Sequence, residues 1–159
     1  MIPEQPSLDD IASLNVLAKG IIPPDETDGG AAMVFAGLNA ADKFRKGINA
    51  EVYAEGLRIA ASLAKERYRR AVDELSPQEI HSLLGLLLDR APAFFKQLRM
   101  DVCALYLSEP TVWQRIGFPG PSAASGGYSD FDKPQKLKVF LSRLTWQSIL
   151  RRSVFKIRK

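Results

Sequence analysis

The sequence predicts an all-α fold: a single helical domain of five to six helices, with a long ordered Gly/Pro/aromatic loop and a basic C-terminal helix or tail. Apolar residues recur at steps of three and four along several segments, and capping signals and prolines separate those segments. No alternation of period two lasts more than a few residues, and no Asn-Gly or Asp-Gly hairpin joins two β-rich runs. We expect residues 1–134 to form the helical domain and residues 135–159 a basic amphipathic extension.

Composition is that of a soluble globular protein. The chain has 159 residues, of which 46% are apolar and 25% are charged, and this length can bury about 70% of the unfolded surface. The single cysteine, Cys103, excludes an internal disulfide, and its helical setting predicts a small buried apolar residue. The chain opens MIPEQPSLDD, without a basic or apolar signal region, and no apolar run reaches the ~18 residues of a membrane span. We therefore expect a cytoplasmic location.

The first helix has a clear beginning and end. Ser7 is suited to the N-cap, and two aspartates follow in the first turn, where the helix dipole favours anions. The helix ends before Pro23 and Pro24, and its apolar stripe comprises Leu8, Ile11, Leu14, Ala18 and Ile21. The acidic segment 25–30 lacks the alternating ligands of a calcium loop, so we interpret it as a solvated turn. A second helix is expected over residues 31–46.

A long third helix is predicted over residues 49–75. Its apolar seam is narrow and contains several small side chains. It comprises Tyr53, Leu57, Ala60, Ala64, Tyr68, Ala71 and Leu75. Such a seam suits close contact with another helix, within a bundle or in a free-standing coiled coil; Gly56 and the alanines favour the bundle. Glu66 and Arg70 are spaced to pair on the outer face.

The fourth helix begins with a capping box. Ser76 can cap, Pro77 fits the first helical position, and Glu79 can reach back to the cap. The buried stripe comprises Ile80, Leu83, Leu84 and Leu87. His81, the only histidine, lies beside this stripe without a Ser/His/Asp or Cys/His grouping, so we interpret it as a surface or cap-region residue.

The segment 92–134 combines a helix with an aromatic loop. Pro92 opens a fifth helix, whose apolar face comprises Phe94, Leu98, Val102, Leu105 and Tyr106. After a break at residues 108–110, a short turn carries Trp113, and the prolines and glycines of residues 116–122 exclude a helix. The concentration of Trp113, Phe118, Tyr128 and Phe131 predicts that the loop packs on a surface. That surface belongs either to the domain itself or to a partner, and we keep both possibilities open.

The sequence shows no recognisable catalytic, cofactor-binding or metal-binding motif. Gly117, Gly120, Gly126 and Gly127 match neither dinucleotide-binding nor P-loop spacing, and no buried strand precedes them. One histidine, one cysteine and no metal-ligand spacing leave little material for catalysis. We therefore predict no catalytic, cofactor-binding or metal-binding residue here.

Three segments carry a resemblance to a known family that extends over residues 8 to 134. They are the run FFKQLRMDVCALYLSEPTVWQRIGFPGPS, the Gly126-Gly127-Tyr128 after it and, more weakly, Ile21-Ile22-Pro23. They resemble the gluconate 2-dehydrogenase subunit 3 family, the small subunits of bacterial FAD-dependent dehydrogenases whose large subunit is a GMC-type flavoprotein. The resemblance implies a non-catalytic subunit that binds and stabilises, or helps fold or export, a flavoprotein oxidising a sugar, glycoside or sugar acid.

The same resemblance implies that FAD is held by the large subunit and that a cytochrome c subunit or another acceptor takes the electrons. We expect contact with the large subunit through Trp113, Ile116, Gly117, Phe118, Pro119, Gly120, Pro121, Gly127 and Tyr128. Many members carry a twin-arginine signal and this chain shows none. We therefore expect a location that is cytoplasmic or, within an exported complex, periplasmic.

The charge is unevenly distributed. Nine basic residues and no acid lie between Lys133 and Lys159, which leaves 13 basic against 18 acidic residues in the remainder. Such an amphipathic extension can pack on its own domain, on an acidic partner or on an anionic membrane. Nucleic acid is a weaker option because no recognisable binding module accompanies it. The alternative function is therefore a free-standing helical adaptor that binds a membrane surface or nucleic acid through residues 135–159.

Overall fold

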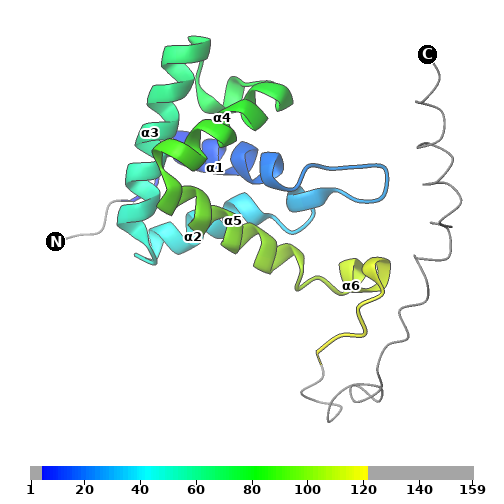
Figure 1. Ribbon diagram of the computed structural model, residues 1–159. Coiled ribbons are helices and arrows are strands. Elements are labelled where there is room, and N and C mark those ends of the chain that lie inside the picture. Colours follow the sequence, from blue (N-terminus) through cyan, green and yellow to red (C-terminus); the bar gives the residue numbers. More distant parts are fainter. Residues whose placement is uncertain (1–4, 122–159) are drawn as a thin grey trace, which may run out of the picture. The chain divides into compact units, whose positions relative to one another are not determined.

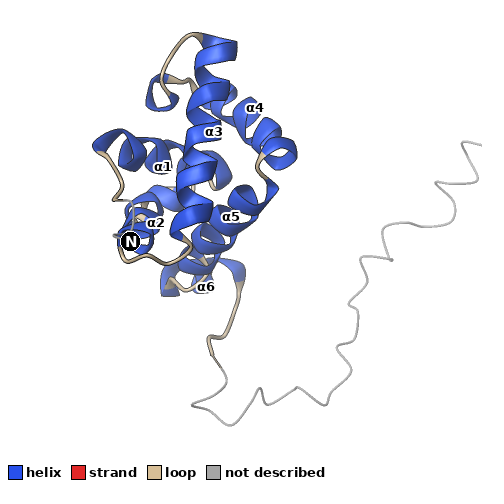
Figure 2. Ribbon diagram, turned by 90° about the vertical axis from the view of Figure 1, so that its left-hand side faces the viewer, coloured by secondary structure: helices blue, strands red, loops and turns tan. Residues whose placement is uncertain are grey.

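The computed structural model describes residues 5–121, and in that part of the chain all regular structure is helical (Figures 1 and 2). The elements are α1 (Leu8–Ile21), η1 (Gly30–Ala32), α2 (Ala36–Arg45), α3 (Ala50–Tyr68), η2 (Val72–Glu74), α4 (Pro77–Arg90), α5 (Pro92–Tyr106) and α6 (Pro110–Ile116). The predicted all-α class is confirmed. The chain divides into the compact units Met1–Pro119 and Gly120–Lys159. The predicted boundary at residue 134 and the basic extension lie outside the described residues.

Helix α5 is the central element of the first unit. It contacts α1, α2, α3 and α4, and in Figure 1 it runs across the unit from the end of α4 towards α6. Its buried face is the predicted one, with Phe94, Leu98, Val102 and Tyr106 enclosed and Leu105 partly buried. Burial of such side chains contributes about 1.5–3 kcal/mol each, so this face is a major source of stability.

Two close helix crossings depend on glycine. A Cβ placed on Gly56 of α3 would lie 2.0 Å from Cγ of Phe94, so no larger residue fits between α3 and α5. A Cβ on Gly37 of α2 would lie 2.5 Å from the Cα of Asn15 in α1. The seam of α3 therefore packs inside its own domain, as the small residues predicted, and its Tyr53 lies between the rings of Phe44 and Phe94.

Local capping signals were predicted correctly. In α1, Ser7 Oγ accepts from the amide of Asp10 at 3.1 Å, and the Asp10 carboxylate accepts from the Ser7 amide at 2.9 Å. In α4, Ser76 and Glu79 form the predicted capping box, with Glu79 Oε2 accepting from the Ser76 amide at 2.8 Å. Each box satisfies amides that the first helical turn leaves without partners.

The predicted third helix was too long. It ends at Tyr68, because Arg69 adopts a left-handed conformation with φ of 60°, and the chain continues into η2. Ala71 is consequently exposed, and Leu75 is buried from the segment that follows η2. Arg70 does not pair with Glu66 as expected, since its guanidinium binds Glu79 on α4.

The first two helices also differ in detail from the prediction. Leu8 is exposed, and Leu17 takes its place in the buried stripe of α1 beside Leu14 and Ala18. The expected helix over 31–46 is divided into η1 and α2, because Phe35 has φ of 51° and interrupts the helix. Cys103, expected to be buried, is partly buried.

Candidate partner-binding surface

Helix α6 carries two of the predicted contact residues, Trp113 and Ile116, and the segment that follows it, residues 117–121, carries five more. Pro110 occupies its first turn, and Gly117, with φ of 71°, ends it in the left-handed conformation that glycine adopts at little cost. The Trp113 indole N–H donates to the carbonyl of Leu107, which fixes the ring against the turn that leads from α5. The Phe118 ring meets Trp113 edge-on, with centroids 5.7 Å apart and planes at 79°.

Part of this cluster faces solvent. Ile116 is 57% exposed and Phe118 is 40% exposed, while Trp113 is partly buried. Together with the exposed Leu107, these residues form what we call the α6 surface: Leu107, Trp113, Ile116 and Phe118. Of the other predicted contact residues, Gly117, Pro119 and Pro121 are exposed, Gly120 is buried, and Gly127 and Tyr128 lie outside the described residues.

An ionic cluster joins α6 to the loop between α1 and η1. Arg115 Nη1 lies 2.5 Å from Asp28 Oδ2 and donates to Thr27 Oγ1 at 2.5 Å. The Tyr106 hydroxyl donates to the same Asp28 oxygen at 2.6 Å and accepts from Arg115 Nη2. In Figure 1 the loop and α6 lie at the same end of the unit, away from α3.

The electrostatics of this cluster match its geometry. Hydrogen bonds from Tyr106 and from the Gly30 amide, with the charge of Arg115, hold the pKa of Asp28 below its ordinary value. Hydrogen bonds from Thr27 and the Asp28 amide lower the pKa of Asp25 to about 2. The hydrogen bond to Asp28 raises the pKa of Tyr106, so its hydroxyl remains a donor at neutral pH.

The interpretation of the acidic segment 25–30 as a solvated turn is therefore only partly correct. Asp25 and Glu26 are exposed, as a solvated turn requires. The side chain of Asp28 is only 12% exposed and is engaged by α5 and α6. These partners, Tyr106 and Arg115, lie 78 and 87 residues after Asp28, and no local signal indicates them.

A second, partly buried polar cluster lies among the helices. Asp101 accepts hydrogen bonds from Tyr53 Oη and Lys43 Nζ, each at 2.6 Å, and from Gln97 Nε2 at 3.0 Å. Burial alone would raise the pKa of Asp101, but these three donors outweigh it and lower the pKa. Burial and the hydrogen bond to Asp101 raise the pKa of Tyr53, which therefore stays neutral. The cluster joins α2, α3 and α5, and its carboxylate is engaged by three donors.

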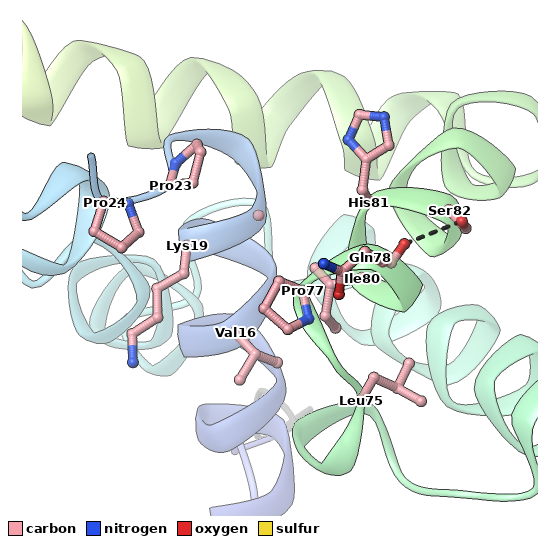
Figure 3. Close-up of a pocket in the computed structure, with 11 residues that line it drawn as sticks. Val16, Lys19, Pro23, Pro24, Leu75, Pro77, Gln78, Ile80, His81 and Ser82 are labelled. Atoms are coloured by element: carbon pink, nitrogen blue, oxygen red, sulfur yellow. Dashed lines mark hydrogen bonds between the residues drawn. The ribbon is translucent and has the colours of Figure 1, made fainter. Parts of the chain in front are cut away.

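A groove of about 670 Å³ lies between α1 and α4 (Figure 3). Its lining is mainly apolar, and Lys19 and His81 are its ionisable members. Ser82 Oγ donates to the carbonyl of Gln78 at 3.1 Å, so this hydroxyl is used within α4. His81 is exposed, as predicted, and within the described part of the chain it has no hydroxyl or carboxylate partner. This arrangement can accommodate apolar groups but assembles no nucleophile and base.

An exposed apolar patch at the start of α2 was not predicted. Phe35 is 69% exposed, and Met33 and Leu38 are exposed beside it in sequence. A positive φ at a bulky aromatic residue costs about 1–3 kcal/mol, and such strain is found preferentially at functional sites. The sequence gives no signal for it, because the left-handed conformation at Phe35 is not favoured by the residue itself.

Within residues 5–121, no group of three metal-ligating side chains converges on one point, and no helix is both long and apolar enough to cross a membrane. The geometry thus defines a class: a small helical module with an exposed apolar surface at α6, whose tryptophan is held by a hydrogen bond. The chain belongs to the gluconate 2-dehydrogenase subunit 3 family, because the family model of that description matches residues 9–120. The predicted family is thereby confirmed over residues 9–120 of the expected 8 to 134, and it is a family of dehydrogenase subunits. No curated protein and no solved structure matches the chain.

Proposed function

We propose that this protein is a non-catalytic small subunit that binds and stabilises an FAD-dependent GMC-type dehydrogenase oxidising a sugar, a glycoside or a sugar acid. Membership of a dehydrogenase-subunit family supports an accessory role in a complex with a larger chain. The single histidine and single cysteine of the sequence give the chain itself little acid–base or nucleophilic material. In this proposal the partner holds FAD and passes electrons to a cytochrome c subunit or another acceptor.

The α6 surface is the observation that carries the proposal. Its exposed side chains, Ile116 and Phe118, adjoin a tryptophan whose ring is held in one orientation. Fixed aromatic and aliphatic side chains are typical anchors at the centres of protein interfaces, because little conformational entropy is lost when they are buried. Pro119, which follows Phe118, restricts the loop, and neither Pro119 nor Gly117 adds charge.

The proposal is tested by purifying the tagged full-length chain from the organism that encodes it. We expect it to bring down a larger chain with the absorbance of bound flavin. Ile116→Asp should reduce this recovery about tenfold or more, because it places a carboxylate in an apolar contact. The matched control is Leu88→Asp on α4, which alters a residue of similar exposure, 53% against 57% for Ile116, and should leave recovery unchanged.

Circular dichroism should show that both variants remain helical. Recovery of a colourless chain without a larger partner contradicts the proposed function. Equal loss of the partner in both variants would show that binding depends on general surface polarity and does not involve the α6 surface.

The alternative function, an adaptor for membranes or nucleic acid, depends on the basic residues between 133 and 159. This segment lies outside the described residues, and only its composition favours the alternative. Deletion of the segment separates the two functions.

A further inference from the structure

Among the described residues, helix α6 has few attachments of its own. It has seven residues, and helices shorter than about 12–15 residues are marginal in water unless they are packed. Val112 is its only buried side chain, and Val112 and Tyr106 are enclosed separately from the main core cluster. Apart from the hydrogen bond from Trp113 to the Leu107 carbonyl, this single apolar contact leaves the orientation of α6 to be fixed by further interactions.

The loop before η1 supplies those interactions in a preorganised form. Asp25 Oδ1 accepts from the amides of Thr27 and Asp28 at 2.7 and 2.9 Å, and Asp28 Oδ1 accepts from the Gly30 amide at 2.7 Å. Gly30 has φ of 58°, and a Cβ at this position would lie 2.4 Å from the carbonyl oxygen of Ile22. The Asp28 carboxylate is therefore positioned by its own loop, so little side-chain entropy is lost when it binds the next partner.

The remaining oxygen of Asp28 faces two donors from different elements. Tyr106 stands at the end of α5, and Arg115 lies in the last turn of α6. The guanidinium also donates to Tyr106, so the three side chains form a closed triangle of contacts. An isolated surface ion pair contributes little, but a network around a largely buried carboxylate is more strongly coupled.

We propose that Asp28, Tyr106 and Arg115 act as a clasp that sets the orientation of α6 and thereby presents Trp113, Ile116 and Phe118 to the partner. These three are positioning residues, since they act through the side chains of the α6 surface. The identity of the partner rests on the proposed function, whereas the effect of the clasp on α6 does not.

The orientation of α6 is followed through the fluorescence of Trp113 in the full-length chain. The sequence has two tryptophans, so Trp146→Phe leaves Trp113 as the only one. In this background we expect Arg115→Gln, Asp28→Asn and Tyr106→Phe each to shift Trp113 emission to the red and to increase its quenching by acrylamide. The double variant Asp28→Asn/Arg115→Gln should behave like either single variant, because the two residues act through each other. The matched control is Arg58→Gln, which removes an arginine paired with Glu55 on α3 and should leave Trp113 unchanged.

The outcomes are distinct. Unchanged Trp113 emission and quenching in all three clasp variants would overturn the proposal, and so would an equal change in the Arg58→Gln control. Changes that add in the double variant would also overturn it, because they would show two independent effects. Far-UV circular dichroism should show that the remaining helices are retained, and Tyr106→Phe, which removes only a hydroxyl, guards against general unfolding.

The positioning role is then measured on the flavoprotein partner purified with the wild-type chain. We expect the clasp variants to bind this partner about tenfold more weakly, and Arg58→Gln to bind it normally. Variants that lose Trp113 protection but bind the partner as tightly as the wild type would overturn the positioning role. If the wild-type chain has no such partner, the proposed function fails, while the Trp113 measurements still decide whether the clasp holds α6.

Discussion

Tyr53 shows how a single hydroxyl can join three helices. Its ring is fully buried between Phe44 and Phe94, and its hydroxyl donates to Asp101, which also binds Lys43 of α2. Tyr53→Phe keeps the ring and removes one of three donors to a carboxylate. We expect the free energy of unfolding to fall by about 1–2 kcal/mol, measured by urea denaturation of the full-length chain.

The matched control for this prediction is Tyr68→Phe. The Tyr68 hydroxyl is only partly buried and lies 3.4 Å from the carbonyl oxygen of Glu79, at the limit of a hydrogen bond. Its loss should change the free energy of unfolding by less than about 0.5 kcal/mol. Similar losses of stability in the two variants would mean that the Tyr53 hydrogen bond to Asp101 stabilises the protein no more than a surface hydrogen bond does.

At the scale of elements, the crossing of α3 and α5 depends on the missing side chain of Gly56. Gly56→Ala gains about 1 kcal/mol of helix propensity but forces a Cβ into the Phe94 ring, which must move within a packed core. We expect a net destabilisation of at least about 1 kcal/mol. Gly85→Ala on α4 has no heavy atom within 4 Å of the new Cβ, so it should stabilise the protein by about 0.5–1 kcal/mol.

Thermal unfolding of the two alanine variants checks this prediction. Both gain the same helix propensity, so the difference in their stability isolates the steric term at the crossing. A stabilised Gly56→Ala variant would show that α3 and α5 can separate without cost.

The elements that could be predicted are those with local causes. The capping box of Ser76 and Glu79 lies within four residues, and the buried stripe of α5 follows from its spacing. The break at Phe35 and the end of α3 at Arg69 could not be predicted, because packing of the whole unit imposes left-handed conformations on residues that do not favour them. The clasp was missed for the same reason: Asp28 meets Arg115 only after the helices between them have packed.

The whole molecule combines a helical unit with a strongly basic end. The family match ends at residue 120 and the described residues end at 121, so both concern the helical unit. The nine basic residues after position 132 leave the remainder with an excess of acidic residues. If the α6 surface provides the main contact, binding of the flavoprotein should depend on the helical unit more than on this charge.

Deletion of residues 135–159 tests this expectation in the organism that encodes the protein. We expect the shortened chain to retain its flavin-containing partner with at most partial weakening, because Ile116 and Phe118 remain in place. Adding Ile116→Asp to the deletion should then abolish recovery of the partner. An adaptor that works through its basic residues would behave in the opposite way, because the deletion would then remove all binding. Binding by its intact chain would also fall steeply as the salt concentration rises, since exposed charges are screened within about 10 Å at 0.1 M salt.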